Sequence, residues 1–119
     1  MIVGIGLDIT EIDRIEQAVK KRSTFSNRVL TQAEWAIFNE LKGSRQIEFL
    51  AGRYAAKEAF SKAFGTGIGK LGFHDIEILP NEKGKPIVTK SPFNGHVFLS
   101  ITHTDAIAAA QIILEKNNL

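Results

Sequence analysis

The spacing of apolar residues changes at about residue 65, and this change constrains the fold more than any other feature. In residues 9–64, apolar side chains recur at intervals of three and four residues, as they do in helices. Beyond it they alternate with polar ones, as they do in strands. Glycines at alternate positions within residues 65–70 break the helical pattern. Helices followed by antiparallel strands predict an α+β fold, with helices packed on an antiparallel sheet.

Each half of the chain divides into shorter elements. Thr31 and Glu34 have the spacing of a capping box, which predicts the start of a helix. Ser44 is the expected cap of the longest helix, and Gly65 is its expected end. The first strand is predicted to be buried, because it is a continuous apolar run. The predicted strands are residues 2–8, 76–79, 86–89, 97–103 and 106–114; the predicted helices are 9–22, 31–43 and 45–64, with a loop at 23–30.

Composition narrows the class of protein. A length of 119 residues predicts one domain, residues 1–119. The chain has no cysteine, which excludes disulfides and thiolate metal ligands and fits a reducing compartment, so a cytoplasmic location is expected. A net charge of +2 is too small to indicate a nucleic-acid binder.

The ends of the chain carry no targeting pattern. Residues 2–9 lack a basic leader and a cleavage site, so we expect no signal peptide. No apolar run approaches the length of a membrane span. Residues 116–119 are expected to fray.

The longest helix carries charged residues on its apolar side. Glu58 and Lys62 share one stripe with Tyr54 and with alanines, at about 100° per residue. Burying a charge without a partner is costly, so such residues usually pair, bind a metal or contact a ligand. Function should therefore be sought here. Arg53 and Lys57 lie on another side, which we interpret as a solvated face.

Asp8 is the second carboxylate of interest. It follows an apolar strand, so it either caps the next helix or belongs to a site at the end of the strand. Together with Glu58 it would supply two oxygen ligands, a set that suits Mg²⁺. Lys62 either neutralises Glu58 as an i,i+4 pair or offers a positive charge to a phosphoryl group, and both can hold at once.

Other motifs are weaker. Gly65 and the glycines after it could approach a phosphate, but a helix C-terminus is the wrong end of the dipole for an anion. His103 extends an apolar row of its strand and is more often structural in such a place. A hydrolase triad of Ser100, His103 and Asp105 is disfavoured, because all three crowd one hairpin. Zinc is disfavoured by the spacing of the histidines.

The end of the first predicted helix and the loop after it are basic. Solvent exposure is the ordinary reason, but such a segment could also receive an acidic protein. The residues concerned are Arg14, Lys20, Lys21, Arg22 and Arg28.

Two long motifs together resemble the holo-(acyl carrier protein) synthases, a family of 4′-phosphopantetheinyl transferases. Residues 4–15 resemble the N-terminal motif of that family, and residues 53–67 resemble its second signature. Residues 100–104 resemble its C-terminal strand motif, and residues 84–86 lie where a similar turn is expected. Tyr54 and Thr102 depart from the usual residues, which affects only packing and secondary contacts.

The resemblance implies a 4′-phosphopantetheinyl transferase-like fold and a group transfer. Phosphopantetheine would pass from coenzyme A to a serine of an apo acyl carrier protein, which releases adenosine 3′,5′-bisphosphate and supports fatty acid biosynthesis. By similarity the protein is expected to be a homotrimer with active sites between subunits.

The resemblance also implies roles for individual residues. Asp8 and Glu58 would hold Mg²⁺ against the pyrophosphate of coenzyme A, and Lys62 would steady the same oxygens. The proton of the acceptor serine would pass to Glu58 or to a water on the metal, a choice that the sequence leaves open. The residues expected to bind coenzyme A are Arg53, Lys57, Lys62, Gly65 and His103; those expected to bind the carrier are Arg14, Lys21 and Arg22.

Two other classes of function remain at this stage. One is a small Mg²⁺-dependent phosphotransferase or nucleotide hydrolase that uses Asp8, Glu58 and Lys62. The other is a non-catalytic binder of acidic proteins, or an assembly module. Nucleic-acid binding is a distant third, because the net charge is low and no recognised motif is present.

Overall fold

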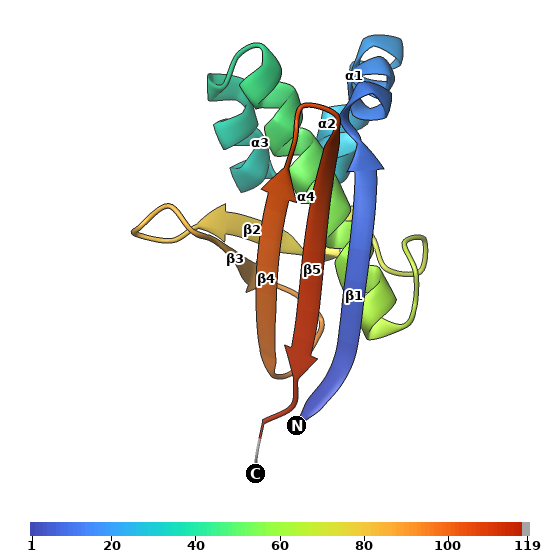
Figure 1. The fold of residues 1–119 in the computed structure, drawn as a ribbon, viewed down its shortest axis with the longest axis vertical. Helices are drawn as coiled ribbons and strands as arrows, with labels where there is room; N and C mark the ends of the chain where they lie inside the picture. The colour runs from blue at the N-terminus through green and yellow to red at the C-terminus, as the bar shows by residue number, and fades with distance from the viewer. Residues whose placement is uncertain (118–119) are drawn as a thin grey trace.

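A three-stranded antiparallel sheet with one long helix behind it forms the centre of the molecule (Figure 1). The computed structural model describes residues 1–117. The strands lie in the order β1 (Ile2–Glu11), β5 (Ile107–Glu115) and β4 (His96–His103). The long helix is α4 (Ser44–Phe64). Because both β1 and β4 pair with β5, the first strand of the chain lies beside the last.

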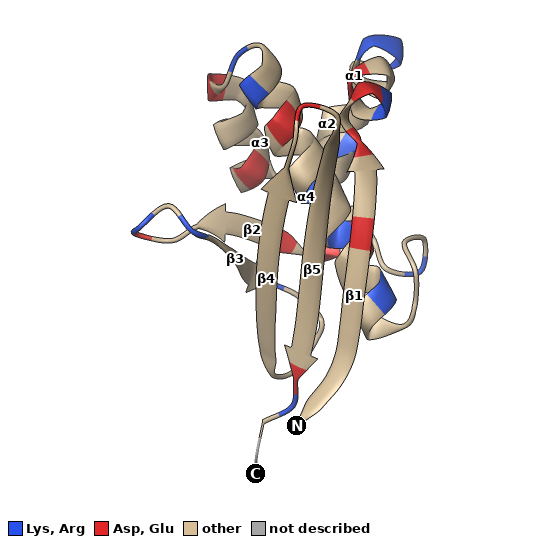
Figure 2. Ribbon diagram, in the orientation of Figure 1, with Lys and Arg blue, Asp and Glu red and all other residues tan. Residues whose placement is uncertain are grey.

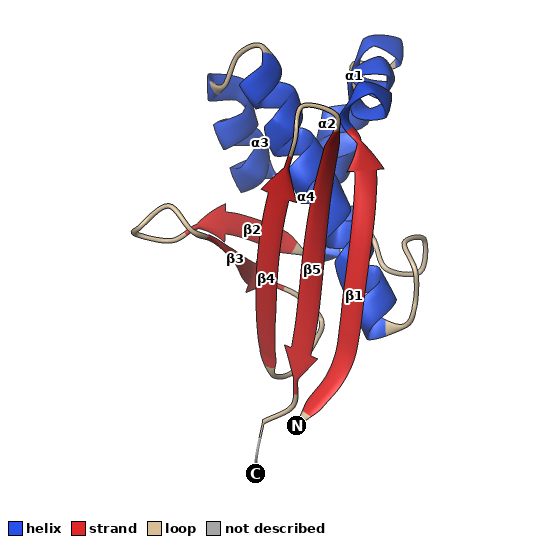
Figure 3. Ribbon diagram, in the orientation of Figure 1, coloured by secondary structure: helices blue, strands red, loops and turns tan. Residues whose placement is uncertain are grey.

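The shorter elements surround one end of α4 and one edge of the sheet. Three helices gather at the N-terminal end of α4, while a separate hairpin crosses behind β4 (Figure 3). The predicted α+β arrangement, with helices packed on an antiparallel sheet, is therefore confirmed. The elements are α1 (Ile12–Lys21), α2 (Phe25–Val29), α3 (Gln32–Glu40), the 3₁₀ turn η1 (Phe73–Asp75), β2 (Glu77–Pro80) and β3 (Pro86–Lys90).

Local sequence signals explain most of the element ends. The Thr31 hydroxyl accepts the amide of Glu34, and the Glu34 carboxylate accepts the amide of Thr31, so the predicted capping box is confirmed. Gly65 ends α4 with a φ of 89°, a left-handed conformation that glycine adopts without strain. Ser44 is the first residue of α4 and Gly43 is its cap, so the predicted serine cap is wrong.

Two predictions in the first thirty residues are also wrong. The first strand does not end at Asp8 but continues to Glu11, because residues 8–11 keep pairing with β5. Ile9, which was predicted to begin a helix, is therefore a strand residue with an exposed side chain. The predicted loop at 23–30 contains the short helix α2. The expected strands of the second half are confirmed to within about two residues.

The strand β1 is buried on one face only, which corrects the prediction of a buried strand. Its outward side chains are apolar yet exposed: Ile5 by 62%, Leu7 by 56% and Ile9 by 61%. Phe98 of β4 is exposed on the same sheet. Charged residues colour only small parts of the three strands (Figure 2). The sheet thus has an apolar face that no helix of the described chain covers.

The core lies between the sheet and the helices. One apolar cluster joins α4 to β5 and β2, and a second joins the first turns of α4 to α1, α2 and α3. The helix α4 belongs to both clusters, so it fixes the sheet and the helical end relative to each other. Within residues 1–117 no helix is both long enough and apolar enough to cross a membrane. The expected frayed tail lies partly outside the described residues.

Candidate functional site

The strand β1 and the helix α4 touch through their backbones. A methyl group at Gly6 would lie 1.8 Å from the carbonyl oxygen of Ala59, and one at Gly4 would lie 2.3 Å from that of Ala63. Only glycine permits an approach this close. This close approach brings the next residues of the strand within reach of α4.

Asp8 lies in the middle of β1, opposite Ala110 of β5. The prediction that it caps a helix is therefore wrong. Its Oδ2 accepts a hydrogen bond of 2.7 Å from the Thr10 hydroxyl. Its Oδ1 accepts one of 3.1 Å from Lys62 Nζ, which also donates to the Leu7 carbonyl oxygen at 3.0 Å. The carboxylate is thus held in place from two sides.

Glu58 faces the same space as Asp8. Burial raises the pKa of the Glu58 carboxyl, the negative charge of Asp8 raises it further, and Lys62 partly offsets this. The predicted i,i+4 pair of Glu58 with Lys62 is not found: among the ion pairs of residues 1–117, Lys62 pairs with Asp8. Two carboxylates distant in sequence are therefore neighbours.

A hollow of about 250 Å³ opens in front of these carboxylates. Arg14 gives it a positive charge, and the rings of Phe25 and Tyr54, 6.2 Å apart, form part of its wall. Burial raises the pKa of the Tyr54 hydroxyl, and the charge of Glu58 adds to the effect. The full lining is Asp8, Ile9, Thr10, Arg14, Ile15, Ala18, Phe25, Tyr54 and Glu58.

The donor set fits a hard divalent ion that brings other ligands with it. No group of three or more His, Cys, Asp or Glu side chains comes together as a metal centre within the described chain. Asp8 and Glu58 alone are two carboxylates whose repulsion a cation would relieve. Mg²⁺ is typically held by one or two carboxylates, with water and phosphate oxygens completing its octahedron. The residues therefore fit Mg²⁺ and do not fit a closed zinc site.

Arg53 and Lys57 do not lie on a solvated face, so that interpretation is wrong for both. Lys57 is completely buried, and its ammonium group is enclosed by Glu34 and the Val29 carbonyl. A nitrogen held in this way does not reach a ligand at the surface, which corrects its expected place among the coenzyme A contacts. Burial lowers the pKa of Lys57, and the Glu34 carboxylate partly offsets this.

Arg53 and His103 are brought together, but away from Asp8. Both line a second hollow of about 230 Å³, which also contains Arg45 and Glu48. Arg53 donates to the Ile78 carbonyl and stacks over the Phe49 ring, while His103 Nδ1 lies 3.9 Å from Glu48. The structure thus separates the carboxylate hollow from a more basic hollow at the C-terminal end of β4.

The remaining predicted residues lie at the ends of helices. Gly65 follows the last residue of α4, three positions beyond Lys62. Lys21 is the last residue of α1 and Arg22 is its cap, both exposed, as expected of a basic helix end. Arg14, by contrast, lies in the carboxylate hollow itself.

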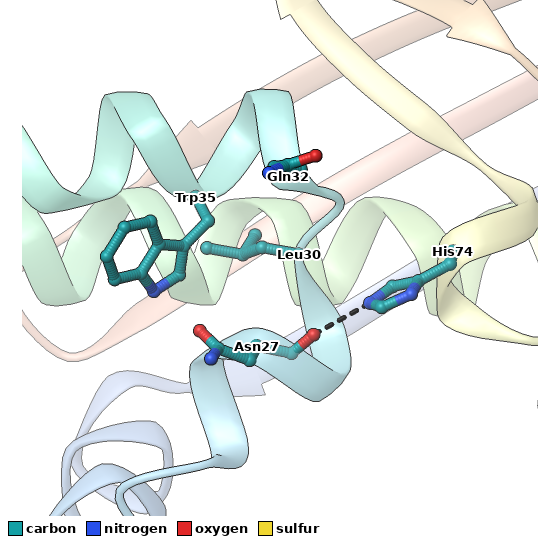
Figure 4. Close-up of a pocket in the computed structure, with 5 residues that line it drawn as sticks. All are labelled: Asn27, Leu30, Gln32, Trp35 and His74. Carbon is teal, nitrogen blue, oxygen red and sulfur yellow. Dashed lines mark hydrogen bonds between the residues drawn. The ribbon is translucent and has the colours of Figure 1, made fainter.

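A third hollow, of about 310 Å³, carries no carboxylate (Figure 4). It lies between α2, α3 and η1, and its lining is Asn27, Leu30, Gln32, Trp35 and His74. His74 Nε2 donates to the Asn27 carbonyl at 2.7 Å, which holds η1 against α2. Its size alone does not make it the site, because the groups that can activate a phosphate lie elsewhere.

Sequence reasoning missed the roles of two residues, one at the site and one in the buried interior. Thr10 orients Asp8, and its spacing of two on one strand would have indicated this, had the strand been predicted to continue. Glu34 was identified only as part of a capping box, although it also neutralises Lys57. No sequence signal pairs Glu34 with a lysine 23 positions away.

Comparison with known proteins defines the class. Residues 4–112 match the model of the 4′-phosphopantetheinyl transferase superfamily, and the chain belongs to that superfamily. It is 56% identical over 119 residues to the holo-(acyl-carrier-protein) synthase of Streptococcus mutans, with 100% of both chains covered. It is 58% identical over 116 residues to that of Enterococcus faecalis, covering 98% of this chain and 99% of the other.

Solved structures agree. The holo-(acyl-carrier-protein) synthase of Bacillus anthracis in complex with CoA (3′,5′-ADP) superposes with a TM-score of 0.92 at 51% identity, covering 98% of this chain and 99% of the other. That of Helicobacter pylori in complex with coenzyme A gives a TM-score of 0.83 at 36% identity, covering 93% and 99%. The resemblance to the holo-(acyl carrier protein) synthases is confirmed, and the chain is an enzyme of this family.

Proposed function

We propose that this enzyme transfers 4′-phosphopantetheine from coenzyme A to a serine hydroxyl of an apo acyl carrier protein and releases adenosine 3′,5′-bisphosphate. One observation carries the proposal: Asp8 of β1 and Glu58 of α4 border a single hollow, with Lys62 bonded to Asp8. The relatives named above, which carry this activity in their names, support it.

Asp8 and Glu58 are proposed to hold Mg²⁺. When bound, the ion would withdraw charge from the phosphoryl group under attack and from the leaving phosphate. Thr10 keeps Asp8 oriented for this task through its 2.7 Å hydrogen bond. The Lys62 side chain is half exposed, so its ammonium group can donate to a phosphate oxygen beside Asp8 without any movement of α4.

Glu58 is the proposed acceptor of the serine proton. Burial and the neighbouring charge of Asp8 raise the pKa of the Glu58 carboxyl in the metal-free protein. It borders the open hollow, where an incoming hydroxyl can approach. Proton transfer to Glu58 would leave the serine oxygen free to attack the phosphorus.

The carrier protein is proposed to dock on the basic end of α1. Arg14 lies in the carboxylate hollow, and Lys20, Lys21 and Arg22 follow along or after α1. Basic groups beside an active site favour an acidic partner and speed its encounter. An acidic carrier used in fatty acid biosynthesis fits this surface. The hollow of Arg53 and His103, together with the Gly65 loop, is proposed to receive the nucleotide end of coenzyme A.

The enzyme is proposed to act as a homotrimer in the cytoplasm. The uncovered sheet face of Ile5, Leu7, Ile9 and Phe98 supports an assembly, because exposed apolar patches of this kind usually mark interfaces. Light scattering of the purified protein tests the number of subunits. Leu7→Glu is expected to give monomers, while the exposed Glu82→Gln is expected to leave the assembly unchanged. A wild-type protein that is monomeric at micromolar concentration would contradict this part.

The transfer itself is tested with purified enzyme, Mg²⁺, coenzyme A and an apo carrier protein. The expected result is a carrier that gains the mass of one phosphopantetheine group. Glu58→Gln is expected to abolish this gain while its thermal melting remains cooperative. Hydrolysis of nucleotides without modification of the carrier would instead favour the phosphotransferase alternative. Carrier binding without any turnover would favour the non-catalytic one.

A further inference from the structure

Three helices meet at the buried ammonium group of Lys57. Its Nζ donates to the Val29 carbonyl oxygen at 2.7 Å and to Glu34 Oε1 at 2.6 Å. The side chains of both Lys57 and Glu34 are 0% exposed. The lysine belongs to the middle of α4, Val29 is the last residue of α2, and Glu34 lies in the first turn of α3.

Glu34 uses both of its carboxylate oxygens. Oε1 also accepts the amide of Thr31 at 2.8 Å, and Oε2 accepts the amide of Ile78 in β2 at 2.7 Å. One carboxylate therefore connects α3, α4 and β2, while the lysine adds α2. A buried charged pair is retained at the expense of desolvation, and it is weak evidence for stability alone. The transfer reaction described above gives neither residue a task.

The short helix α2 depends on this connection. It has five residues and no side-chain cap, and a helix so short is not stable on its own. Its last carbonyl groups lack partners within the helix, and Lys57 supplies one at Val29. A positive charge at this end also complements the helix dipole. Lys57 therefore holds the C-terminal end of α2 against α4.

The other end of α2 reaches the carboxylate hollow. Phe25, its first residue, forms part of the wall of that hollow, with its ring 6.2 Å from that of Tyr54 on α4. Tyr54 lies one turn before Lys57 and Glu58 on the same helix. A shift of α2 along α4 would thus move Phe25 relative to Glu58 without moving either proposed metal ligand.

We propose that the buried Glu34–Lys57 pair is a positioning device that seats α2 against α4, so that Phe25 forms the wall along which the carrier protein approaches Asp8 and Glu58. The inference rests on the proposed function, because it names the partner that uses this wall. Glu34 and Lys57 are positioning residues: they touch no reacting group and act through α2.

Steady-state kinetics separate positioning from simple stabilisation. In Lys57→Met, the KM for the carrier protein is expected to rise about tenfold or more, because small misplacements near a site have effects of that size. The KM for coenzyme A and the kcat at saturating carrier are expected to stay within about threefold of wild type. Lys83→Met, the same change at an exposed lysine between β2 and β3, is the control and should change nothing. A similar fold-change in the KM for the carrier, the KM for coenzyme A and the kcat would overturn the proposal.

Amide hydrogen exchange tests the seating of α2 without any substrate. Lys57→Met should speed exchange of residues 25–30 relative to β5, whereas Lys83→Met should not. Unchanged exchange in that segment would overturn the inference even if the enzyme is active. If the wild-type enzyme modifies no carrier, the proposed function fails, while the exchange experiment still decides whether Lys57 seats α2.

A double variant keeps the test available if Lys57→Met does not fold. Glu34→Gln with Lys57→Met removes both buried charges, so no unpaired carboxylate remains. The Val29 carbonyl still lacks its donor. The double variant is therefore expected to regain cooperative melting yet to retain the raised KM for the carrier and the fast exchange of α2. A double variant with wild-type KM and exchange would overturn the proposal.

Discussion

Two lysines of α4 each pair with an acid from another part of the chain, and the two pairs differ in almost every physical respect. Lys57 and Glu34 are 2.6 Å apart and wholly buried. Lys62 and Asp8 are 3.1 Å apart, and their side chains are 54% and 14% exposed. The first pair has no access to solvent, whereas the second borders an open hollow. The same residue type thus has a structural contact on one face of the helix and, under the proposed function, a chemical task on another.

The difference teaches where function can reside. Both oxygens of the Glu34 carboxylate already accept hydrogen bonds from protein groups. Replacing one of these donors with a ligand would leave that buried donor unsatisfied. Lys62 keeps water on part of its ammonium group and can change partners at small cost. Charge alone therefore does not identify a catalytic lysine; exposure beside a second functional group does.

The largest expected effect contrasts the two lysines in stability. Lys57→Met should lower the free energy of unfolding by about 3–5 kcal/mol, because it leaves a buried carboxylate without its partner. Lys62→Met should lower it by about 0–1 kcal/mol, as for exposed pairs. Urea unfolding followed by circular dichroism measures both values. Equal losses in the two variants would break the distinction between the pairs.

For activity the order should reverse: the site of Asp8 and Glu58 should matter more than the buried Glu34–Lys57 pair. Glu58→Gln should reduce the rate of carrier modification by about 10²–10⁴-fold, as expected when a general base is removed. Glu82→Gln, the same change at an exposed loop position, should retain the wild-type rate. Initial rates followed by mass spectrometry of the carrier give the comparison. An active Glu58→Gln enzyme would remove Glu58 from the site.

The contact that brings Asp8 to α4 can be tested through Gly6. Gly6→Ala should lower the free energy of unfolding by about 1–3 kcal/mol, because the new methyl group would overlap the Ala59 carbonyl. Gly72→Ala is the matched control: its φ is −80° and its nearest neighbour would be an ordinary contact at 3.4 Å. Chemical denaturation of the two proteins provides the measurement. A harmless Gly6→Ala would mean that β1 and α4 are not held this closely.

The smallest expected effect concerns pH. The pKa of Glu58 is raised in the folded protein, so the folded state holds this proton more tightly than the unfolded chain does. Stability due to this group is therefore lost as pH rises above the ordinary carboxyl value of 4.5. Glu58→Gln should melt slightly above wild type at pH 7, by about 1–3 °C, and equally near pH 4. Melting curves at both pH values test the sign; a lower Tm at pH 7 would contradict it.

How much the sequence predicts depends on the range of the interaction. The capping box at Thr31 and the C-cap at Gly65 are local signals, and both were predicted correctly. The pairing of Asp8 with Glu58 was suggested by their residue types and then implied by motif resemblance, because no spacing rule links two such distant positions. The boundary after Asp8 was misplaced because an apolar run reads equally well as strand or helix until its partner, β5, is known.

Long-range burial was the main source of error. Lys57 and Arg53 looked solvated, since a helical wheel shows which residues share a face but not what covers it. The cover of that face comes from α2, α3 and β2, and Glu34 is the acid that makes a buried Lys57 tolerable. Likewise, the apolar side chains of β1 indicated burial, although only one face of the strand meets α4.

At Gly4 and Gly6 the backbones of β1 and α4 meet with no side chain between them. This seam has a consequence for how the enzyme can evolve. With no side chain in the seam, the gap between strand and helix is set by main-chain atoms already in contact, so it cannot be widened in small steps by exchanging one core residue for a slightly larger one. Laboratory evolution of new substrate preferences should therefore alter the rim of the hollow and leave the seam untouched.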